Sequence, residues 1–268
     1  MSRMRTSVIW LANVTLGSVP IATARRNRFF LHFDAGASNI AASAMNAPML
    51  RCRNLRCRRP LWRAGASQVR GITAEFAAGK FHAIRGDEGC GKNLLLHLLG
   101  LLEQPDEGNV WLGNIDTTSL GAEERDSLRL RNFGFLFPAC ALLPSLSLLE
   151  NIAFPVIKAG VGDEVLQAER TLLALQFCGM ESEADLPVSR LSPERQAVGA
   201  FARAIAHRPR VLIAESPAAE ELIVPLARLA VDEFGLTVVW GSRGDGPATG
   251  AADRVLSMAD GHICAVAA

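Results

Sequence analysis

The sequence has no excess of charge of either sign. Its 268 residues include 28 Lys and Arg against 27 Asp and Glu, so the formal net charge is +1. A protein whose main partner is a polyanion generally presents a strongly basic surface, which attracts that partner electrostatically. The charge balance therefore gives no support to nucleic acid as a partner, and we expect none.

The cysteines lack the spacing of a metal site or a redox motif. No Cys-x-x-Cys pair occurs, and no histidine stands near a cysteine at the spacing of a zinc ligand. Scattered cysteines of this kind are typical of free thiols in a reducing compartment. We expect this state for all six, namely Cys52, Cys57, Cys90, Cys140, Cys178 and Cys264.

Long apolar runs are also missing. A helix that spans a bilayer needs about 20 predominantly apolar residues, and the strongly apolar run Leu94–Leu102 is much shorter than that. The sequence therefore predicts no transmembrane segment, and any membrane role is expected to be peripheral.

Residues 1–47 form an extension that differs from the rest of the chain. Basic residues flank the apolar stretch Val8–Ala22, which loosely imitates a secretory signal. Polar residues such as Asn13 interrupt that stretch and weaken the resemblance. We favour the alternative that the extension is disordered, or that it precedes a natural start at Met45.

Segments typical of strands and of helices alternate from Met49 onward. Short runs rich in β-branched residues are typical of buried parallel strands. Strands are expected at an edge in Leu50–Leu55, and further at Phe81–Arg85, Phe133–Phe137, Arg210–Ala214, Leu236–Gly241 and Arg254–Met258. Helices are expected at Asn93–Leu102, Leu142–Phe154, Glu164–Cys178 (with Asp163 as N-cap) and Pro193–His207. This alternation predicts an α/β domain with a largely parallel sheet.

The segment Gly86-Asp-Glu-Gly-Cys-Gly-Lys-Asn93 matches the phosphate-loop pattern G-x-x-x-x-G-K and lies between a predicted strand and a predicted helix. Its glycines allow backbone N–H groups to turn inward around phosphate oxygens. The positive end of the following helix adds to the attraction. The pattern predicts a nucleotide site at Gly86, Gly89, Cys90, Gly91, Lys92, Asn93 and Leu94, with Lys92 reaching the terminal phosphates.

Asn93 is the first departure from the pattern, which requires Ser or Thr at this position. A hydroxyl is a compact Mg²⁺ ligand, whereas an amide is bulkier and Mg²⁺ demands a near-octahedral shell. Metal binding is therefore expected to weaken. Asp87 and Glu88 add two negative charges to the loop and are expected to face solvent. His97, on the leucine-rich helix, is expected to be a surface or packed residue and not a ligand.

From about Leu50 to Ile263 the chain resembles the ATP-binding subunits of ABC transporters, above all the lipoprotein-release and macrolide-export branch. Four stretches carry this resemblance: Gly86–Gly100, Phe133–Pro155, Leu191–Glu215 and Asp253–Ile263. The resemblance implies a P-loop NTPase core of the ABC ATPase type with an inserted helical subdomain. On this basis residues 48–268 are the nucleotide-binding domain, with the helical subdomain at about 139–195.

The same resemblance shows that most catalytic motifs of the family are changed. The Q-loop glutamine, which touches Mg²⁺ and senses the membrane partner, falls at Pro138. The signature Leu-Ser-Gly-Gly-Gln, which meets the γ-phosphate held by the opposite subunit, becomes Leu191, Ser192, Pro193, Glu194 and Arg195. Proline stiffens that turn and lacks a backbone donor. The glutamate brings a carboxylate to a place where an anion binds, although the arginine offsets part of its charge.

The positions of the metal ligand, the general base and the switch histidine are changed as well. The Walker B aspartate maps to Glu215, which together with Asn93 is expected to hold Mg²⁺ weakly at best. The general base maps to Ser216 and the switch histidine to Ser242. A serine hydroxyl does not take a proton from water at neutral pH. The aromatic residue that stacks on adenine is replaced by Arg59, with Trp62 as a nearby substitute.

These changes lead to a functional hypothesis with two alternatives. The chain is expected to be a pseudo-ATPase that binds ATP weakly, with doubtful Mg²⁺, and serves as a regulatory or structural subunit of a membrane transport complex. Its partner would be a permease or a competent ABC ATPase, and its place the cytoplasm, peripheral at the inner face of the cytoplasmic membrane. The alternatives are an active ATP-hydrolysing subunit with atypical motifs and a decaying gene product.

Overall fold

The computed structural model describes residues 48–58 and 68–267. They divide into a helical unit, Ala141–Arg208, and a sheet unit formed by the described residues of Asn46–Cys140 and Pro209–Ala268. The helical unit runs beyond the expected range 139–195, because helix α7 (Pro193–Ala206) packs within it against the two helices before it. The expectations for residues 1–47, Arg59 and Trp62 lie outside the described residues.

The smaller sheet is antiparallel and has the strand order β2-β1-β4-β5. Its strands are β1 (Pro48–Arg58), β2 (Gln68–Ala77), β4 (Glu107–Leu112) and β5 (Ile115–Asp116). Buried and exposed residues alternate along β2, as in a sheet with one covered face. The expectation of a short edge strand at Leu50–Leu55 was wrong, because β1 spans 11 residues and pairs with both β2 and β4.

The larger sheet has the order β10-β9-β3-β8-β7-β6 and is parallel except for the β9–β10 hairpin. Its strands are β3 (Phe81–Arg85), β6 (Phe133–Leu136), β7 (Val211–Glu215), β8 (Thr237–Ser242), β9 (Arg254–Ala259) and β10 (His262–Ala267). β3, β7 and β8 are almost continuously buried, as expected for parallel strands covered on both faces. The predicted α/β architecture with a largely parallel sheet is confirmed.

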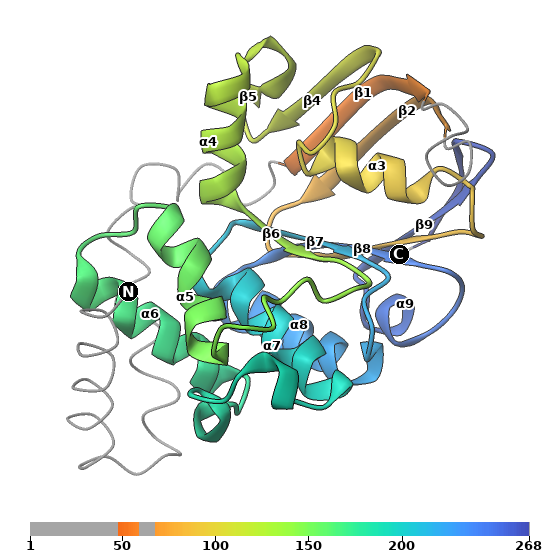
Figure 1. Cartoon of the computed structure of the whole chain (residues 1–268). Helices are drawn as coiled ribbons and strands as arrows, with labels where there is room; N and C mark the ends of the chain where they lie inside the picture. Colours follow the sequence, from red (N-terminus) through yellow and green to blue (C-terminus); the bar gives the residue numbers. More distant parts are fainter. Residues whose placement is uncertain (1–47, 59–67, 268) are drawn as a thin grey trace. The chain divides into compact units, whose positions relative to one another are not determined.

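Helix α3 (Lys92–Leu99) lies between the two sheets (Figure 1). Its leucines belong to one hydrophobic core with Phe76 of β2 and Ile213 of β7. Helices α8 (Glu220–Phe234) and α9 (Pro247–Ala251) cover the opposite face of the larger sheet (Figure 1), and α4 (Ala122–Asn132) precedes β6. Burial on both sides fixes the direction of α3 and therefore the position of the loop that precedes it.

The helical unit consists of α5 (Leu148–Lys158), α6 (Glu164–Phe177) and α7. α6 begins as predicted, because the Asp163 side chain accepts a hydrogen bond from Leu166 N at 3.0 Å. α5 begins later than the expected Leu142, since Ser147 and Glu150 form a capping box at its start. None of the helices in the described part of the chain has the length and apolar character needed to cross a membrane.

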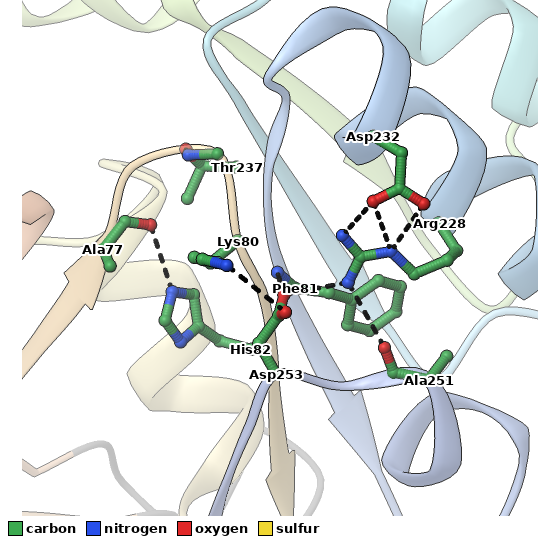
Figure 2. A network of polar contacts seen from close by, with 10 residues as sticks. Ala77, Lys80, Phe81, His82, Arg228, Asp232, Thr237, Ala251 and Asp253 are labelled. Carbon is green, nitrogen blue, oxygen red and sulfur yellow. Dashed lines mark hydrogen bonds and ion pairs between the residues drawn. The ribbon is translucent and has the colours of Figure 1, made fainter. Parts of the chain in front are cut away.

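A polar network joins the first residues of β3 and β9 to α8 (Figure 2). The Asp253 carboxylate accepts hydrogen bonds from Phe81 N and from Arg228 Nη1, both at 2.8 Å, and lies 3.6 Å from Lys80 Nζ. Arg228 also binds Asp232 at 2.6 Å. Burial raises the pKa of the Asp253 carboxyl, but the bonds from Arg228 and Phe81 outweigh it and hold the pKa below its usual value. The network anchors the strand whose other end carries the candidate site.

Candidate functional site

The predicted phosphate loop lies between the end of β3 and the start of α3, and both neighbouring strands hold it. Gly86 N donates to Ser242 O at 3.2 Å, which fixes the loop to the end of β8. Gly261 N, in the β9–β10 turn, donates to Cys90 O at 2.9 Å. Within the loop, Cys90 N donates to Asp87 O at 3.3 Å. The loop is therefore a preformed turn in the sheet unit.

Two glycines of the loop allow a close approach of backbone to backbone. A Cβ added at Gly91 would lie 2.1 Å from Gln68 O, and Gly91 has φ +96°, which favours glycine. A Cβ added at Gly86 would lie 2.4 Å from Met258 O. These positions accept only glycine without a shift of the backbone. The sequence pattern thus reflects packing of the loop against β2 and β9.

The start of α3 presents donors that fit a phosphate. Gly91, its N-cap residue, gives no side-chain capping bond, and the helical ladder begins with Leu95 N donating to Gly91 O. The N–H groups of the first turn therefore precede that ladder. Lys92 is 5% exposed, and among the described residues its ammonium has no ion-pair or hydrogen-bond partner. A buried cation beside an uncapped helix start is suited to an anionic phosphate group.

Two side chains of α3 hold the carboxylate of Glu215, at the end of β7. Asn93 Nδ2 donates to Glu215 Oε1 at 2.6 Å, and His97 Nε2 lies 2.8 Å from Glu215 Oε2. The imidazole nitrogen acts as donor here, because an ionised carboxylate only accepts. The Glu215 side chain is 14% exposed. Both of its oxygens are thus bound within the chain.

The residue that directly follows Glu215 in the chain is a serine and not a carboxylate. Ser216 has φ +38°, and both its backbone N–H and its Oγ donate to Gly241 O, at 3.1 and 3.0 Å. Ser242 is 5% exposed, and its Oγ donates to Gly244 O at 2.9 Å. Both serines are therefore bound to backbone carbonyls.

The remaining loop positions lie at the surface. Asp87 and Glu88 are exposed, as expected for charges that must not face a phosphate at close range. Pro138, after β6, is also exposed. Arg85, the last residue of β3, donates through Nε to Ser257 Oγ at 2.8 Å and pairs with Asp245. The loop after β8, which contains Asp245, is therefore attached to β3.

The expected signature segment lies in the helical unit, at the start of α7. Ser192 is the N-cap and accepts a bond from Arg195 N, with Pro193 at the first helical position. The pKa of the Glu194 carboxyl is lowered by its own backbone N–H and by the Ser192 hydroxyl. Arg195 is not directed to an outside anion, because it binds the Glu183 carboxylate through Nε at 2.6 Å and Gly179 O at 2.9 Å. The segment forms a capped helix start with a carboxylate beside it.

The site residues fit a nucleotide phosphate but not Mg²⁺. The uncapped helix start and the Lys92 ammonium suit a phosphate. A magnesium ion at Glu215 would share the carboxylate with two nitrogen donors, and the Asn93 amide stands in place of the compact hydroxyl ligand of the loop pattern. No group of three or more His, Cys, Asp and Glu side chains that could hold a metal ion occurs in residues 48–58 and 68–267.

The structure brings together residues that the sequence places far apart. Gly86–Asn93, Glu215, Ser216 and Ser242 meet at the carboxyl ends of β3, β7 and β8, since parallel strands end at one edge of the sheet. The contact of His97 with Glu215 was missed. The only signal for it was the spacing of His97 four residues after Asn93, which places both on one face of a helix.

Comparison with known proteins agrees with this geometry. The family described as ABC transporter matches residues 69–219. A lipoprotein-releasing system ATP-binding protein LolD from Hyphomonas neptunium is 32% identical over 75% of this chain and 90% of its own length. A macrolide export ATP-binding/permease protein MacB from Rhodopirellula baltica is 35% identical over 73% of this chain.

The matched lengths differ among these relatives. The matched part spans 29% of the Rhodopirellula protein and 66% of a LolD protein from Paramagnetospirillum magneticum. Among solved structures, a dimeric post-hydrolysis state of the ATP-binding cassette MJ0796 bound to ADP and Pi is 27% identical, with a TM-score of 0.73. The comparison covers 82% of this chain and 98% of that one.

Proposed function

Because the chain belongs to the ABC transporter family, in the branch of the LolD and MacB ATP-binding proteins, we propose that it is a pseudo-ATPase of that family. It binds ATP weakly, does not hydrolyse it efficiently, and acts as a regulatory or structural subunit of a membrane transport complex. Nucleotide binding is the retained property, and turnover is the lost one.

Nucleotide binding rests on the phosphate loop. The backbone turn Gly86–Gly91, the uncapped start of α3 and the Lys92 ammonium together offer donors and positive charge to phosphate groups. Asp87 and Glu88 are exposed, so solvent screens their repulsion. The site is therefore suited to a nucleotide, with an affinity lowered by these charges and by the loss of a metal ligand at Asn93.

The loss of hydrolysis rests on the pair Glu215 and Ser216, the observation that carries the proposal. Hydrolysis needs a base that takes a proton from the attacking water, and Ser216 provides none. Its hydroxyl and its N–H are both bound to Gly241 O. Loss of a general base lowers a rate by about 10²- to 10⁴-fold, or about 3–5 kcal/mol in the barrier. The neighbouring Glu215 is held by Asn93 and His97 and does not replace it.

The changes at α7 support the same conclusion independently. A γ-phosphate that approached this helix start from a second subunit would meet the Glu194 carboxylate, and Pro193 offers it no N–H. The Arg195 guanidinium is bound to Glu183 and does not neutralise that carboxylate. Closure of two subunits around ATP is therefore unfavourable.

The relatives named as LolD are ATP-binding proteins of a lipoprotein-releasing system, and those named as MacB are ATP-binding/permease proteins, which supports a membrane partner for this chain. We propose a separate permease subunit or a competent ABC ATPase as that partner, with the chain at the cytoplasmic face of the membrane. Co-expression with a permease encoded beside this chain tests the partner, and a stable complex is expected.

An active ATP-hydrolysing subunit with atypical motifs is the second candidate. It is favoured by the glycines and Lys92 of the phosphate loop and by a carboxylate still present at the end of β7. Turnover of ATP that depends on Lys92 separates it from the first.

Equilibrium titration with ATP tests the binding half of the proposal. Lys92→Ala is expected to lower the affinity by about ten- to hundredfold, because a bond between charged groups contributes about 1.5–3 kcal/mol. The matched control is Lys158→Ala, an exposed lysine of the helical unit, which should bind as the wild type does. Absence of ATP binding, or binding equal in both variants, would contradict the proposal.

A further inference from the structure

The Glu215 carboxylate occupies the place of a metal ligand but is bound by two nitrogen donors. Asn93 and His97 stand four residues apart on one face of α3, and each takes one carboxylate oxygen, at 2.6 and 2.8 Å. The Glu215 side chain is 14% exposed, the His97 side chain is 32% exposed, and the bond to Asn93 lies at the surface. Each oxygen of the carboxylate therefore has a hydrogen-bond donor within the chain.

A divalent cation gains little from such a carboxylate. Mg²⁺ needs oxygen ligands at short, near-octahedral distances and gives up its own water reluctantly. At Glu215 it would share the carboxylate with two nitrogen donors, whose charge-assisted bonds already offset part of the negative charge that a cation needs. Asn93 replaces the loop hydroxyl, and its amide nitrogen donates to Glu215.

The positive charge that a phosphate requires is supplied by the chain itself. Lys92 is 5% exposed and, within the described ranges, has no ion-pair partner. The N–H groups at the start of α3 add partial positive charge at the same place. A nucleotide therefore finds counter-charge in the loop without a metal ion.

We propose that this site binds the metal-free form of the nucleotide, so that Mg²⁺ does not increase its affinity. The inference rests on the proposed function, since it concerns the same loop, and it adds the ionic form of the ligand. Asn93 and His97 are positioning residues that hold Glu215 away from metal coordination.

The test is a titration of purified protein with ATP at one pH, once with excess MgCl₂ and once with EDTA. The wild-type dissociation constants are expected to agree within about twofold, a free-energy difference well below that of a tenfold change. In the variant Asn93→Ser/His97→Ala, which frees both oxygens of Glu215, Mg²⁺ is expected to tighten ATP binding by about tenfold or more. A matched control, Asn114→Ser/His262→Ala, makes the same chemical changes at exposed positions and should behave as the wild type.

A second measurement reports directly on the hydrogen bond between Asn93 and Glu215. The side-chain amide resonances of Asn93, assigned in a nitrogen-15 spectrum, are expected to stay unchanged when MgCl₂ is added to the ATP complex. Thermal unfolding followed by circular dichroism checks that the double variant folds, and Asn93→Ser alone replaces it if it does not.

The outcomes separate the two proposals. Tightening of wild-type binding by Mg²⁺ would overturn the metal-free inference and leave nucleotide binding intact. The inference would also be overturned if the folded double variant remained insensitive to Mg²⁺, because Asn93 and His97 would then not be the cause. No ATP binding in either buffer would overturn the proposed function, and the inference with it.

Discussion

At the scale of single residues, Ser216 is bound in a way that a glutamate cannot reproduce. Its φ of +38° is unusual for a residue other than glycine, and its Oγ donates to Gly241 O at 3.0 Å. Ser216→Glu removes this bond, at a cost of about 0.5–1.5 kcal/mol in the free energy of unfolding. We predict that the variant gains no ATPase activity, because Glu215 and the α7 segment are unchanged. Denaturant titration and phosphate release measure the two effects.

A Ser216→Glu variant with Lys92-dependent turnover would show that the missing base is the only defect. The variant Ser216→Ala is the control, since it loses the same hydrogen bond without adding a carboxylate. Its stability should fall by a similar amount.

Gly91 is the loop residue with the narrowest steric tolerance. An alanine Cβ would lie 2.1 Å from Gln68 O, at a φ of +96°. Gly91→Ala is expected to destabilise the protein by more than the roughly 1–2 kcal/mol of left-handed strain alone and to abolish ATP binding. Gly113→Ala is the matched control, because Gly113 also has a positive φ (+56°) but open space around it. Equal losses of stability in the two variants would contradict the packing argument.

The site was predictable from the sequence where its residues are contiguous. The loop Gly86–Asn93 has a motif whose glycines follow from backbone geometry, and it was recognised. The contact between His97 and Glu215 joins residues 118 positions apart, and no local pattern specifies the partner of a side chain at that distance. The pairing of Arg195 with Glu183, which consumes the expected compensating charge, was not foreseen either, because Glu183 lies 12 positions earlier and outside α7, where helical spacing does not specify a partner.

At the scale of elements, the hydrogen bonds of Asp253 to β3 and α8 make the stability of the protein depend on pH. The folded pKa of Asp253 lies below the unfolded value of about 3.9, so its stabilising contribution is full above that value and is lost as the pH falls through the folded pKa. Asp253→Asn is expected to lower the stability at pH 7 by about 1–3 kcal/mol. It should also flatten the loss of stability below about pH 4. Urea titrations at several pH values measure both effects.

The control for this prediction is Glu75→Gln, an exposed carboxylate on β2 in the same unit. An acid profile of Asp253→Asn that matches the wild type would show that the network does not set the pKa of this group.

The elements themselves were predictable to different degrees. The parallel strands β3, β7 and β8 are short and largely apolar, and the structure has strands at the expected positions within one residue. β2 and β4 were missed, because neither carries a motif, the apolar residues of β2 alternate with polar ones, and β4 has only three apolar residues, all at its end. α5 was placed six residues too early, since the apolar run from Leu142 continues a helical pattern that the Ser147 cap interrupts.

At the scale of the whole molecule, the account predicts that ATP does not drive formation of a homodimer. A second copy would bring its own Glu194 carboxylate to the bound phosphates, and desolvation of like charges is unfavourable. Light scattering with and without excess Mg²⁺-ATP is expected to show the same mass. A monomer that becomes a dimer only with ATP would contradict the prediction.

The most direct test of the pseudo-ATPase proposal is steady-state phosphate release from the purified chain with Mg²⁺-ATP, compared with that from Lys92→Ala. Lys92 is the one buried cation of the phosphate loop among the described residues, so turnover at this site must depend on it. The account predicts equal background rates for the two proteins. A turnover of about 1 s⁻¹, within the ordinary range of enzymes and abolished by Lys92→Ala, would contradict it.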